Sequence, residues 1–243
     1  MRAVPLSKDL SIYISDEHSF GTDAVLLASF AGSGKKGLRA LDIGTGCGII
    51  PMLLIRDRAV SEVYGIDISE KAVTAAKRTA KENGVEDIFT VGCADLRERP
   101  SAKTGYYDLV TCNPPYFAQG SGAENENSAD TAARHETECT LADVCSAAAR
   151  SLRYGGRFCL CHKPERLADI MTEMRKARLE PKRLRFVIQR AGDAPWLVLV
   201  EGKLGGKPSL DVMPSLCIEE NGKLSAEMLA IYGDYKEGHG DGI

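Results

Sequence analysis

The sequence predicts an α/β fold built on a mostly parallel sheet. The first observation is a repeated alternation, from residue 38 onward, of an apolar run, a turn and a helical pattern. The second is that acids or glycines follow several of these apolar runs, at the edge where open parallel sheets bind ligands. The third is an apolar run at 107–112 that ends abruptly in Asn113-Pro114-Pro115-Tyr116.

Apolar periodicity and turn residues predict the elements in order. Residues 1–19 fit a short hairpin or arm, and Thr22 or Asp23 is expected to cap the first helix. Strands are expected at 39–43, 62–66, 88–92, 107–112, 157–161, 182–189 and 196–201, the last two as an antiparallel edge. Helices are expected at 22–31, 49–55, 70–82, 141–152 and 164–178. Residues 117–139 are polar, so we expect a mobile substrate lid there, and the tail from 202 is loosely patterned.

Composition narrows the class of protein. The net charge of −3 creates no global attraction to nucleic acid, so any RNA contact must come from a local basic face. The eight cysteines form no Cys-x-x-Cys pair and lie mostly in apolar runs, which indicates small buried side chains in a reducing cytoplasm and no zinc site. We find no secretory signal and no run long enough to span a bilayer, so we expect a cytoplasmic protein without membrane contact.

A glycine-rich turn follows the run at 39–43. Gly44, Gly46 and Gly48 depart from the G-x-G-x-x-G spacing of dinucleotide enzymes, but they still allow backbone N–H groups to approach a ligand at a helix start. Asp42 precedes them, where a carboxylate repels a pyrophosphate and attracts a cation. S-adenosyl-L-methionine carries a sulfonium and an ammonium group, so Asp42, Gly44 and Gly46 are candidate residues for binding it.

Two more acids follow the next two runs. Asp67 is placed where ribose hydroxyls can donate to its carboxylate, and Ile68 is placed to pack on the adenine ring. Asp95 is expected to accept from the adenine amino group, with Leu96 covering the ring. One acid after a strand often only caps a helix. Three of them with a glycine turn favour an S-adenosyl-L-methionine site.

The corner after residue 112 offers a different chemistry. Prolines cannot donate to a sheet ladder, so the strand must end, and Pro114 restricts the backbone of Asn113. The Asn113 side-chain oxygen and the Pro114 carbonyl are expected to accept from a planar NH2 group on which Tyr116 stacks. Asn113, Pro114 and Tyr116 are thus catalytic candidates, and Asn113 is also a candidate cofactor contact. Asn-Pro-Pro-Tyr is typical of methyltransferases that act on such nitrogens, and the sequence resembles that group.

Motifs spread along the chain narrow this resemblance. They are FGTDAVLLA at 20–28, NPPYF at 113–117, GSG at 120–122, ARHE at 133–136 and KPERL at 163–167. Together they resemble the bacterial valine-tRNA adenosine-37 N6-methyltransferases and their close relatives. The resemblance implies a Rossmann-like class I methyltransferase fold, with a mostly parallel sheet of seven strands, an antiparallel strand at its edge, and helices on both faces. It also implies an N-terminal arm and helix at 1–37 beside the active-site mouth, and a methyltransferase domain at 38–243.

The candidate substrate contacts combine this resemblance with local charge. They are Pro115, Phe117, Arg134, His135, Lys163, Arg166, Lys182, Arg183 and Arg185. Arg134 and His135 either close over the substrate or cap the next helix. Residues 163–190 carry nine Lys or Arg against four Asp or Glu, and this face either holds tRNA phosphates or is an ordinary solvated surface.

Three other functions stay open. Protein glutamine N5-methyltransferases of the release-factor type share the Asn-Pro-Pro-Tyr corner, but they usually carry a helical domain for which the stretch before Asp42 is too short. DNA adenine methylation is less favoured because we find no target-recognition segment. A non-catalytic RNA-binding scaffold is disfavoured by the presence of Asn113 and Tyr116. The oligomeric state does not follow from the sequence.

Overall fold

A central sheet of nine strands organises the protein, in a computed structural model that describes residues 2–14, 20–98, 101–114 and 139–233. Seven strands are long and two, β10 and β11, have two residues each. The long strands are β3 (Leu38–Ile43), β4 (Val60–Asp67), β5 (Phe89–Cys93), β6 (Tyr107–Cys112), β7 (Leu152–His162), β8 (Leu179–Ile188) and β9 (Leu197–Leu204). β3 to β7 are mutually parallel, as the alternating pattern predicts.

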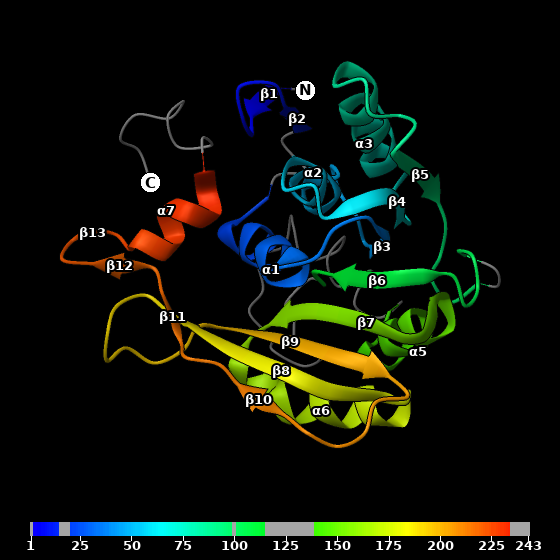
Figure 1. Cartoon of the computed structure of the whole chain (residues 1–243). Coiled ribbons are helices and arrows are strands. Elements are labelled where there is room, and N and C mark those ends of the chain that lie inside the picture. The colour runs from blue at the N-terminus through cyan, green and yellow to red at the C-terminus, as the bar shows by residue number, and fades with distance from the viewer. Residues whose placement is uncertain (1, 15–19, 99–100, 115–138, 234–243) are drawn as a thin grey trace, which may run out of the picture.

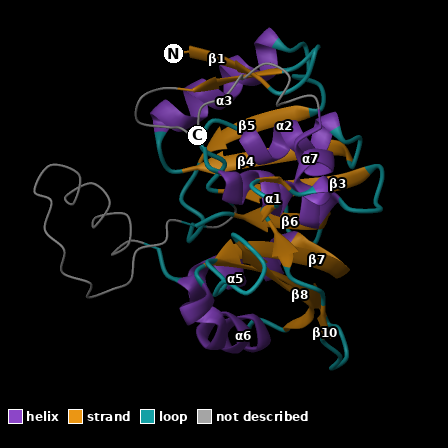
Figure 2. Cartoon of the chain, turned by 90° about the vertical axis from the view of Figure 1, so that its left-hand side faces the viewer, coloured by secondary structure: helices purple, strands orange, loops and turns teal. Residues whose placement is uncertain are grey.

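The strand order reverses its direction next to β3. The order is β10-β8-β9-β7-β6-β3-β4-β5; Figure 2 shows the labelled strands from β5 to β10 in this order, and Figure 1 shows β9 between β7 and β8. The chain runs outward from β3 to β5 and then crosses back to β6 on the other side of β3. This reversal is where open α/β sheets bind ligands, beyond the carboxyl ends of the strands. The glycine turn follows β3 and the Asn-Pro corner follows β6, so both lie at this point.

One antiparallel strand is present, as predicted, but the prediction that it forms the edge of the sheet is wrong. β9 lies inside the sheet, antiparallel to both β7 and β8, and the edge is formed by β8 with the short strands β10 (Asp211–Val212) and β11 (Leu216–Cys217). The physical reason is visible in the burial of the two strands. The first six residues of β9 are all buried, whereas β8 alternates between buried and partly exposed positions.

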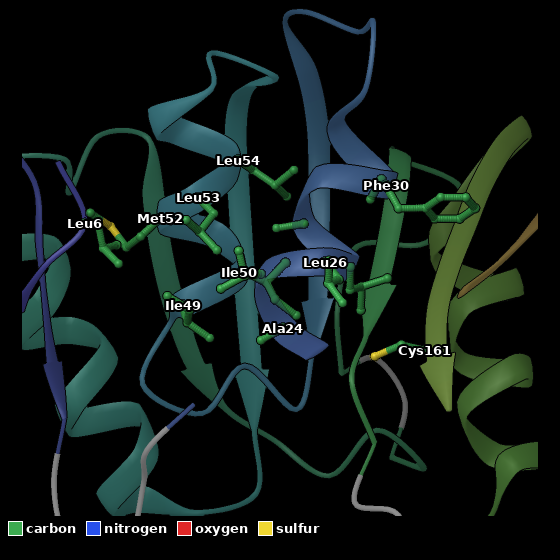
Figure 3. Packing of buried hydrophobic residues seen from close by; sticks show 14 of the residues in the cluster. Leu6, Ala24, Leu26, Phe30, Ile49, Ile50, Met52, Leu53, Leu54 and Cys161 are labelled. Atoms are coloured by element: carbon green, nitrogen blue, oxygen red, sulfur yellow. The ribbon is translucent and has the colours of Figure 1, made fainter. Parts of the chain in front are cut away.

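Helices cover both faces of the sheet (Figure 1). One face packs against α1 (Thr22–Gly32), α2 (Ile49–Arg56) and α3 (Glu70–Glu82). The other face packs against α5 (Leu141–Ser151) and α6 (Leu167–Lys176), which follows the 3-10 turn η1 (Pro164–Arg166). Figure 3 shows part of the first core, in which Leu26 of α1 belongs to the same cluster as Ile50 and Leu53 of α2. The expected fold of a mostly parallel sheet between two helical layers is therefore confirmed.

The N-terminal hairpin that the sequence predicts is present. β1 (Arg2–Pro5) pairs with β2 (Ser11–Ile14), and the hairpin rests on α3. The Asn83 side chain both accepts from Ser11 N at 2.8 Å and donates to Ser11 O at 2.7 Å. The hairpin is therefore fastened to the C-terminal end of α3.

The tail from residue 202 is more ordered than its pattern indicates. It contains β12 (Glu219–Glu220), β13 (Lys223–Leu224) and α7 (Ala226–Tyr232). α7 packs on α1, and Arg56 donates to the Tyr232 and Ile231 carbonyls at 3.1 and 3.0 Å. A short helix held by such distant partners leaves little periodicity in the sequence, which explains why it is not predicted.

Several element ends differ from their predicted positions. The predicted helix at 164–178 starts as a 3-10 turn and ends at Lys176, and the helix predicted at 141–152 ends at Ser151. Gly21, with no side-chain bond, precedes α1 in place of the predicted Thr22 or Asp23 cap. The lid expected at 117–139 lies outside the described residues, apart from Cys139. In the described part of the chain, no helix has both the length and the apolar character needed to cross a membrane.

Candidate active site

The glycine turn after β3 is held by the neighbouring strand. Gly44 and Thr45 donate to the Ile66 carbonyl at 2.9 and 3.0 Å, and Gly44, Gly46 and Gly48 have φ angles of 70°, 55° and 87°. Glycine adopts such angles at no steric cost, whereas most other residues are disfavoured there. A Cβ atom on Gly44 or Gly46 would meet no atom of the described residues within 4 Å, so those residues leave space open over the turn. The turn thus offers room for a ligand beside its backbone.

Asp67 fastens this turn to the next helix. At the end of β4, its Oδ2 accepts from Gly46 N and its Oδ1 accepts from Ser69 N, both at 2.9 Å. Ser69 in turn caps α3 by accepting from Ala72 N. Each carboxylate oxygen can accept a further hydrogen bond, so Asp67 is fixed in place and can still bind a hydroxyl.

A substitution at Gly48 tests how tightly the glycine turn is packed. We expect Gly48→Ala to lower the free energy of unfolding by about 2–3 kcal/mol, because alanine is strained at positive φ and crowding in a core adds to the cost. Its Cβ would come within 2.8 Å of the Phe89 ring, which is buried. Urea unfolding measures the change. Gly84→Ala is the matched control, since Gly84 also has positive φ but no atom within 4 Å of the new Cβ, and it should cost only about 1 kcal/mol. Equal losses in the two variants would contradict the packing argument.

Asp42 lies beneath the turn and is only 1% exposed. Its Oδ1 accepts from Thr111 Oγ1 at 2.6 Å across the β3–β6 pair, whereas its Oδ2 and Thr45 Oγ1 are buried without a hydrogen bond of normal geometry among the described residues. Burial raises the pKa of Asp42 to about 7, against the opposing effect of the Thr111 hydrogen bond. A buried carboxylate with an unsatisfied oxygen is suited to a cationic ligand group.

The three residues expected to contact the adenine ring differ in their exposure and in their contacts within the protein. Ile68 is 45% exposed, an unusual position for a large apolar side chain and one that suits contact with a flat ring. Leu96 is partly buried against the second core. Asp95 accepts from Arg97 Nε at 3.0 Å, and this guanidinium holds the pKa of Asp95 below its usual range. The sequence reasoning missed Arg97. An adenine amino group that donates to Asp95 would share this carboxylate with the Arg97 guanidinium.

Asn113 is held by two residues from different elements. Its Nδ2 donates to Asp23 Oδ2 at 3.1 Å, and its Oδ1 accepts from the Cys161 thiol at 3.0 Å. Asp23 lies in the first turn of α1, and Cys161 is fully buried in β7, in the core that also contains Ala24 and Leu26 (Figure 3). Asn113 is separated from Asp23 by 90 residues of chain. The sequence reasoning treated Cys161 only as a buried side chain and missed this contact.

His162 ends β7 beside this corner. It is 7% exposed, and burial lowers its pKa to about 4, so the imidazole is neutral at neutral pH. Its Nδ1 accepts from Lys163 N at 2.8 Å, which places the ring proton on Nε2. His162 directly precedes the KPERL motif at 163–167, and this position could have identified it as a candidate site residue. The sequence reasoning did not use it.

The basic segment predicted to hold phosphates is largely engaged within the protein. Arg183 donates to the buried Glu201 at 2.7 Å, and Arg185 forms a bidentate ion pair with Glu227. Lys182 donates to the Lys207 carbonyl at 2.6 Å. Arg166 pairs with Asp169 at 2.8 Å on the surface, and Lys163 is the residue between β7 and η1. Arg183 and Arg185 therefore stabilise the edge of the sheet, which limits their use for RNA.

Several candidate residues fall outside the described part of the chain. They are Pro115, Tyr116, Phe117, Arg134 and His135. Among the residues that the structure does describe, no group of three or more His, Cys, Asp or Glu side chains is arranged to hold a metal ion. The described site thus consists of the glycine turn, the three strand-end acids, Asn113 and Pro114.

Comparison with known proteins places this arrangement in a family. The model of the family described as "Methyltransferase small domain" matches residues 4–176, which include the glycine turn and the Asn-Pro corner. The chain belongs to this family. It is therefore a methyltransferase, and the enzyme class expected from the sequence is confirmed.

Individual relatives and structures agree with this assignment. The chain is 30% identical to the tRNA1(Val) (adenine(37)-N6)-methyltransferase of Tolumonas auensis, over 88% of each chain. A predicted O-methyltransferase from Agrobacterium tumefaciens superposes with a TM-score of 0.70 at 20% identity, over 88% of this chain and 96% of that one. The geranyl diphosphate C-methyltransferase of Streptomyces coelicolor A3(2), solved with Mg2+, geranyl diphosphate and S-adenosyl-L-homocysteine, gives 0.55 at 16% identity, over 74% and 77%. These two structures share the Rossmann-like fold.

The observed residues fit a methyl donor with a cationic amino acid end and a ribose. The turn leaves space over Gly44 and Gly46, and Asp42 Oδ2 accepts no hydrogen bond from the residues that the structure describes. Asp67 keeps acceptor capacity at the end of the neighbouring strand. The site can therefore hold such a donor on one side of β3 and present an acceptor amide, Asn113, on the other.

Proposed function

We propose that this methyltransferase transfers a methyl group from S-adenosyl-L-methionine to the exocyclic N6 of an adenine in tRNA, at A37 of valine tRNA. The chain's relative in Tolumonas auensis carries this activity in its name and aligns over 88% of both chains. The motifs from FGTDAVLLA to KPERL, which follow one another along the chain, resemble those of the valine-tRNA adenosine-37 N6-methyltransferases and support the same assignment.

The cofactor side of the proposal is carried by residues around β3 and β4. Asp42 would hold the cationic methionine end, Gly44 and Gly46 would leave room for the ligand beside the turn, and Asp67 would accept from the ribose hydroxyls. Ile68 would pack on the adenine. When bound, S-adenosyl-L-methionine supplies the methyl group on its sulfonium, so that an N–C bond forms as the C–S bond breaks.

The substrate side is carried by the corner after β6. An exocyclic adenine nitrogen is a weak nucleophile because its lone pair is delocalised into the ring. Asn113 Oδ1 and the Pro114 carbonyl would accept from its two N–H groups, which favours a pyramidal nitrogen and stabilises the positive charge that develops on it. The product nitrogen then releases one proton to water, so no strong base is required. Positioning would supply much of the acceleration.

The Asn-Pro corner next to the glycine turn is the observation that carries this proposal. β3 and β6 are paired neighbours, with Asp42 opposite Thr111, so the glycine turn and the Asn-Pro corner follow adjacent strands at the same end of the sheet. A protein glutamine side chain also presents a planar NH2 group to such a corner, and this substrate is the alternative to test.

A labelling assay separates these substrates. The enzyme is incubated with S-adenosyl-L-methionine carrying a labelled methyl group and with bulk tRNA, release factor or duplex DNA. We expect label in tRNA, and in transcribed valine tRNA we expect it to disappear when only A37 is replaced by guanosine. Replacing a neighbouring adenosine is the control and should leave the label. Label in release factor alone, or tRNA labelling that survives loss of A37, would contradict the proposal.

A further inference from the structure

We propose that Asp23 and Cys161 are positioning residues that fix the Asn113 amide in its reactive orientation. The inference rests on the proposed function of the corner and names two residues, from α1 and β7, that serve it. Asn113 projects from the end of β6, where its amide could turn either way. The contacts on its two sides leave one orientation.

Asp23 determines which end of the amide faces α1. Asp23 Oδ2 accepts from Asn113 Nδ2 at 3.1 Å, while its Oδ1 accepts from Ala24 N at 2.9 Å in the first turn of the helix. Turning the amide over would place its oxygen against a carboxylate, and two acceptors repel each other. The amide nitrogen must therefore face Asp23, and the oxygen must face away from it.

Cys161 supports the oxygen on the opposite side. Its thiol donates to Asn113 Oδ1 at 3.0 Å from a fully buried position in β7. A carbonyl oxygen has two lone pairs, so Oδ1 can accept from the thiol and from one substrate N–H at once. The hydrogen bond to a carboxylate also polarises the amide and makes its oxygen a better acceptor for developing positive charge.

Gly21 provides an independent indication that the Asp23 position matters. Gly21 has φ of −107°, so its backbone does not require glycine. A Cβ atom there would come within 2.7 Å of Asp23 Oδ1. A larger residue would therefore push the Asp23 carboxylate out of place. Glycine leaves the space in which that carboxylate sits against Asn113.

Steady-state kinetics with tRNA and binding of S-adenosyl-L-homocysteine test the proposal. We expect Asp23→Ala and Asp23→Asn to lower kcat about tenfold to a hundredfold, since small displacements of an aligned group are costly, with little change in KM or cofactor affinity. Gly21→Ala should lower kcat in the same way but less. Cys161→Ser should keep most of the activity because its hydroxyl can donate to Oδ1, whereas Cys161→Ala should lose several-fold.

Asp143→Ala is the matched control for Asp23. Asp143 also lies in the first turn of a helix, where it completes the capping box of α5 on the opposite face of the sheet, away from Asn113. Its loss should affect thermal stability without the fall in kcat. If Asp23→Ala loses no more activity than Asp143→Ala, or if Cys161→Ser is as weak as Cys161→Ala, the proposal is overturned.

A measurement without turnover separates this inference from the proposed function. In protein labelled with 15N-asparagine, the Asn113 side-chain resonance is identified by its loss in Asn113→Ala. Its N–H proton should be shifted downfield by the carboxylate and should move upfield in Asp23→Ala. An unchanged resonance would overturn the inference. A wild-type enzyme that shows this shift but labels no tRNA would instead contradict the proposed function alone.

Discussion

Asn113→Ala should reduce methyl transfer by about a thousandfold, the loss typical of removing an aligned group that stabilises transition-state charge. Alanine has no side-chain oxygen to accept a hydrogen bond from the target NH2 group. The lone pair of the target nitrogen therefore stays delocalised into the adenine ring. Binding of S-adenosyl-L-homocysteine should change little, because the glycine turn, Asp42 and Asp67 are untouched. Single-turnover transfer to tRNA and calorimetric binding measure the two effects.

Asn113→Asp is an informative companion to this variant. It keeps the size of the side chain but places a carboxylate beside Asp23, which accepts from the Asn113 amide nitrogen at 3.1 Å in the native protein. We expect it to be as inactive as Asn113→Ala. Turnover of Asn113→Ala within tenfold of the wild type would show that the corner does not perform the chemistry.

Asp42→Asn should make the protein more stable and a poorer binder of the methyl donor. Burial raises the pKa of Asp42 from 3.8 to about 7, so the folded state binds a proton more tightly than the unfolded chain. The free energy of unfolding of the wild type should therefore fall as the pH rises from about 4 to about 7, by as much as about 4 kcal/mol. Asparagine carries no such charge, and its Oδ1 can still accept from Thr111.

Urea unfolding of both proteins across this pH range measures the effect. The variant should exceed the wild type most above pH 7 and least below pH 4. Affinity for S-adenosyl-L-methionine should fall about tenfold to a hundredfold, since a hydrogen bond between charged groups is lost. Thr111→Val is a useful control, because it removes the hydrogen bond to Asp42 but keeps the carboxylate. A wild-type stability that is flat with pH would contradict the raised pKa of the buried Asp42.

The sequence predicted the parts of the site that depend on strand ends. Asp42, Asp67 and Asn113 each follow an apolar run, and parallel strands bring their carboxyl ends to one edge, so sequence position alone indicates that they meet. The interior position of β9 was also readable, since Leu197-Val198-Leu199-Val200 is continuously apolar and an edge strand would alternate.

The contacts that the sequence did not predict join distant segments. Asp23 meets Asn113 only because α1 packs over the sheet, and no local pattern encodes a separation of 90 residues. The charge count of the segment at 163–190 was correct, but its interpretation depends on partners such as Glu201 and Glu227, which lie beyond that segment. A charge count gives the number of charged side chains in a segment, but it does not show which of them are already paired within the protein.

The direct pairing of β3 with β6 has a consequence for how this enzyme can change. The groups that would hold the donor and the acceptor extend from two adjacent strands, and their separation is set by backbone hydrogen bonds between two largely buried strands. Mutations in the connections beyond these strands can therefore alter which nucleotide enters without disturbing the alignment of the reacting atoms. Selectivity and reactivity can evolve separately in such an enzyme.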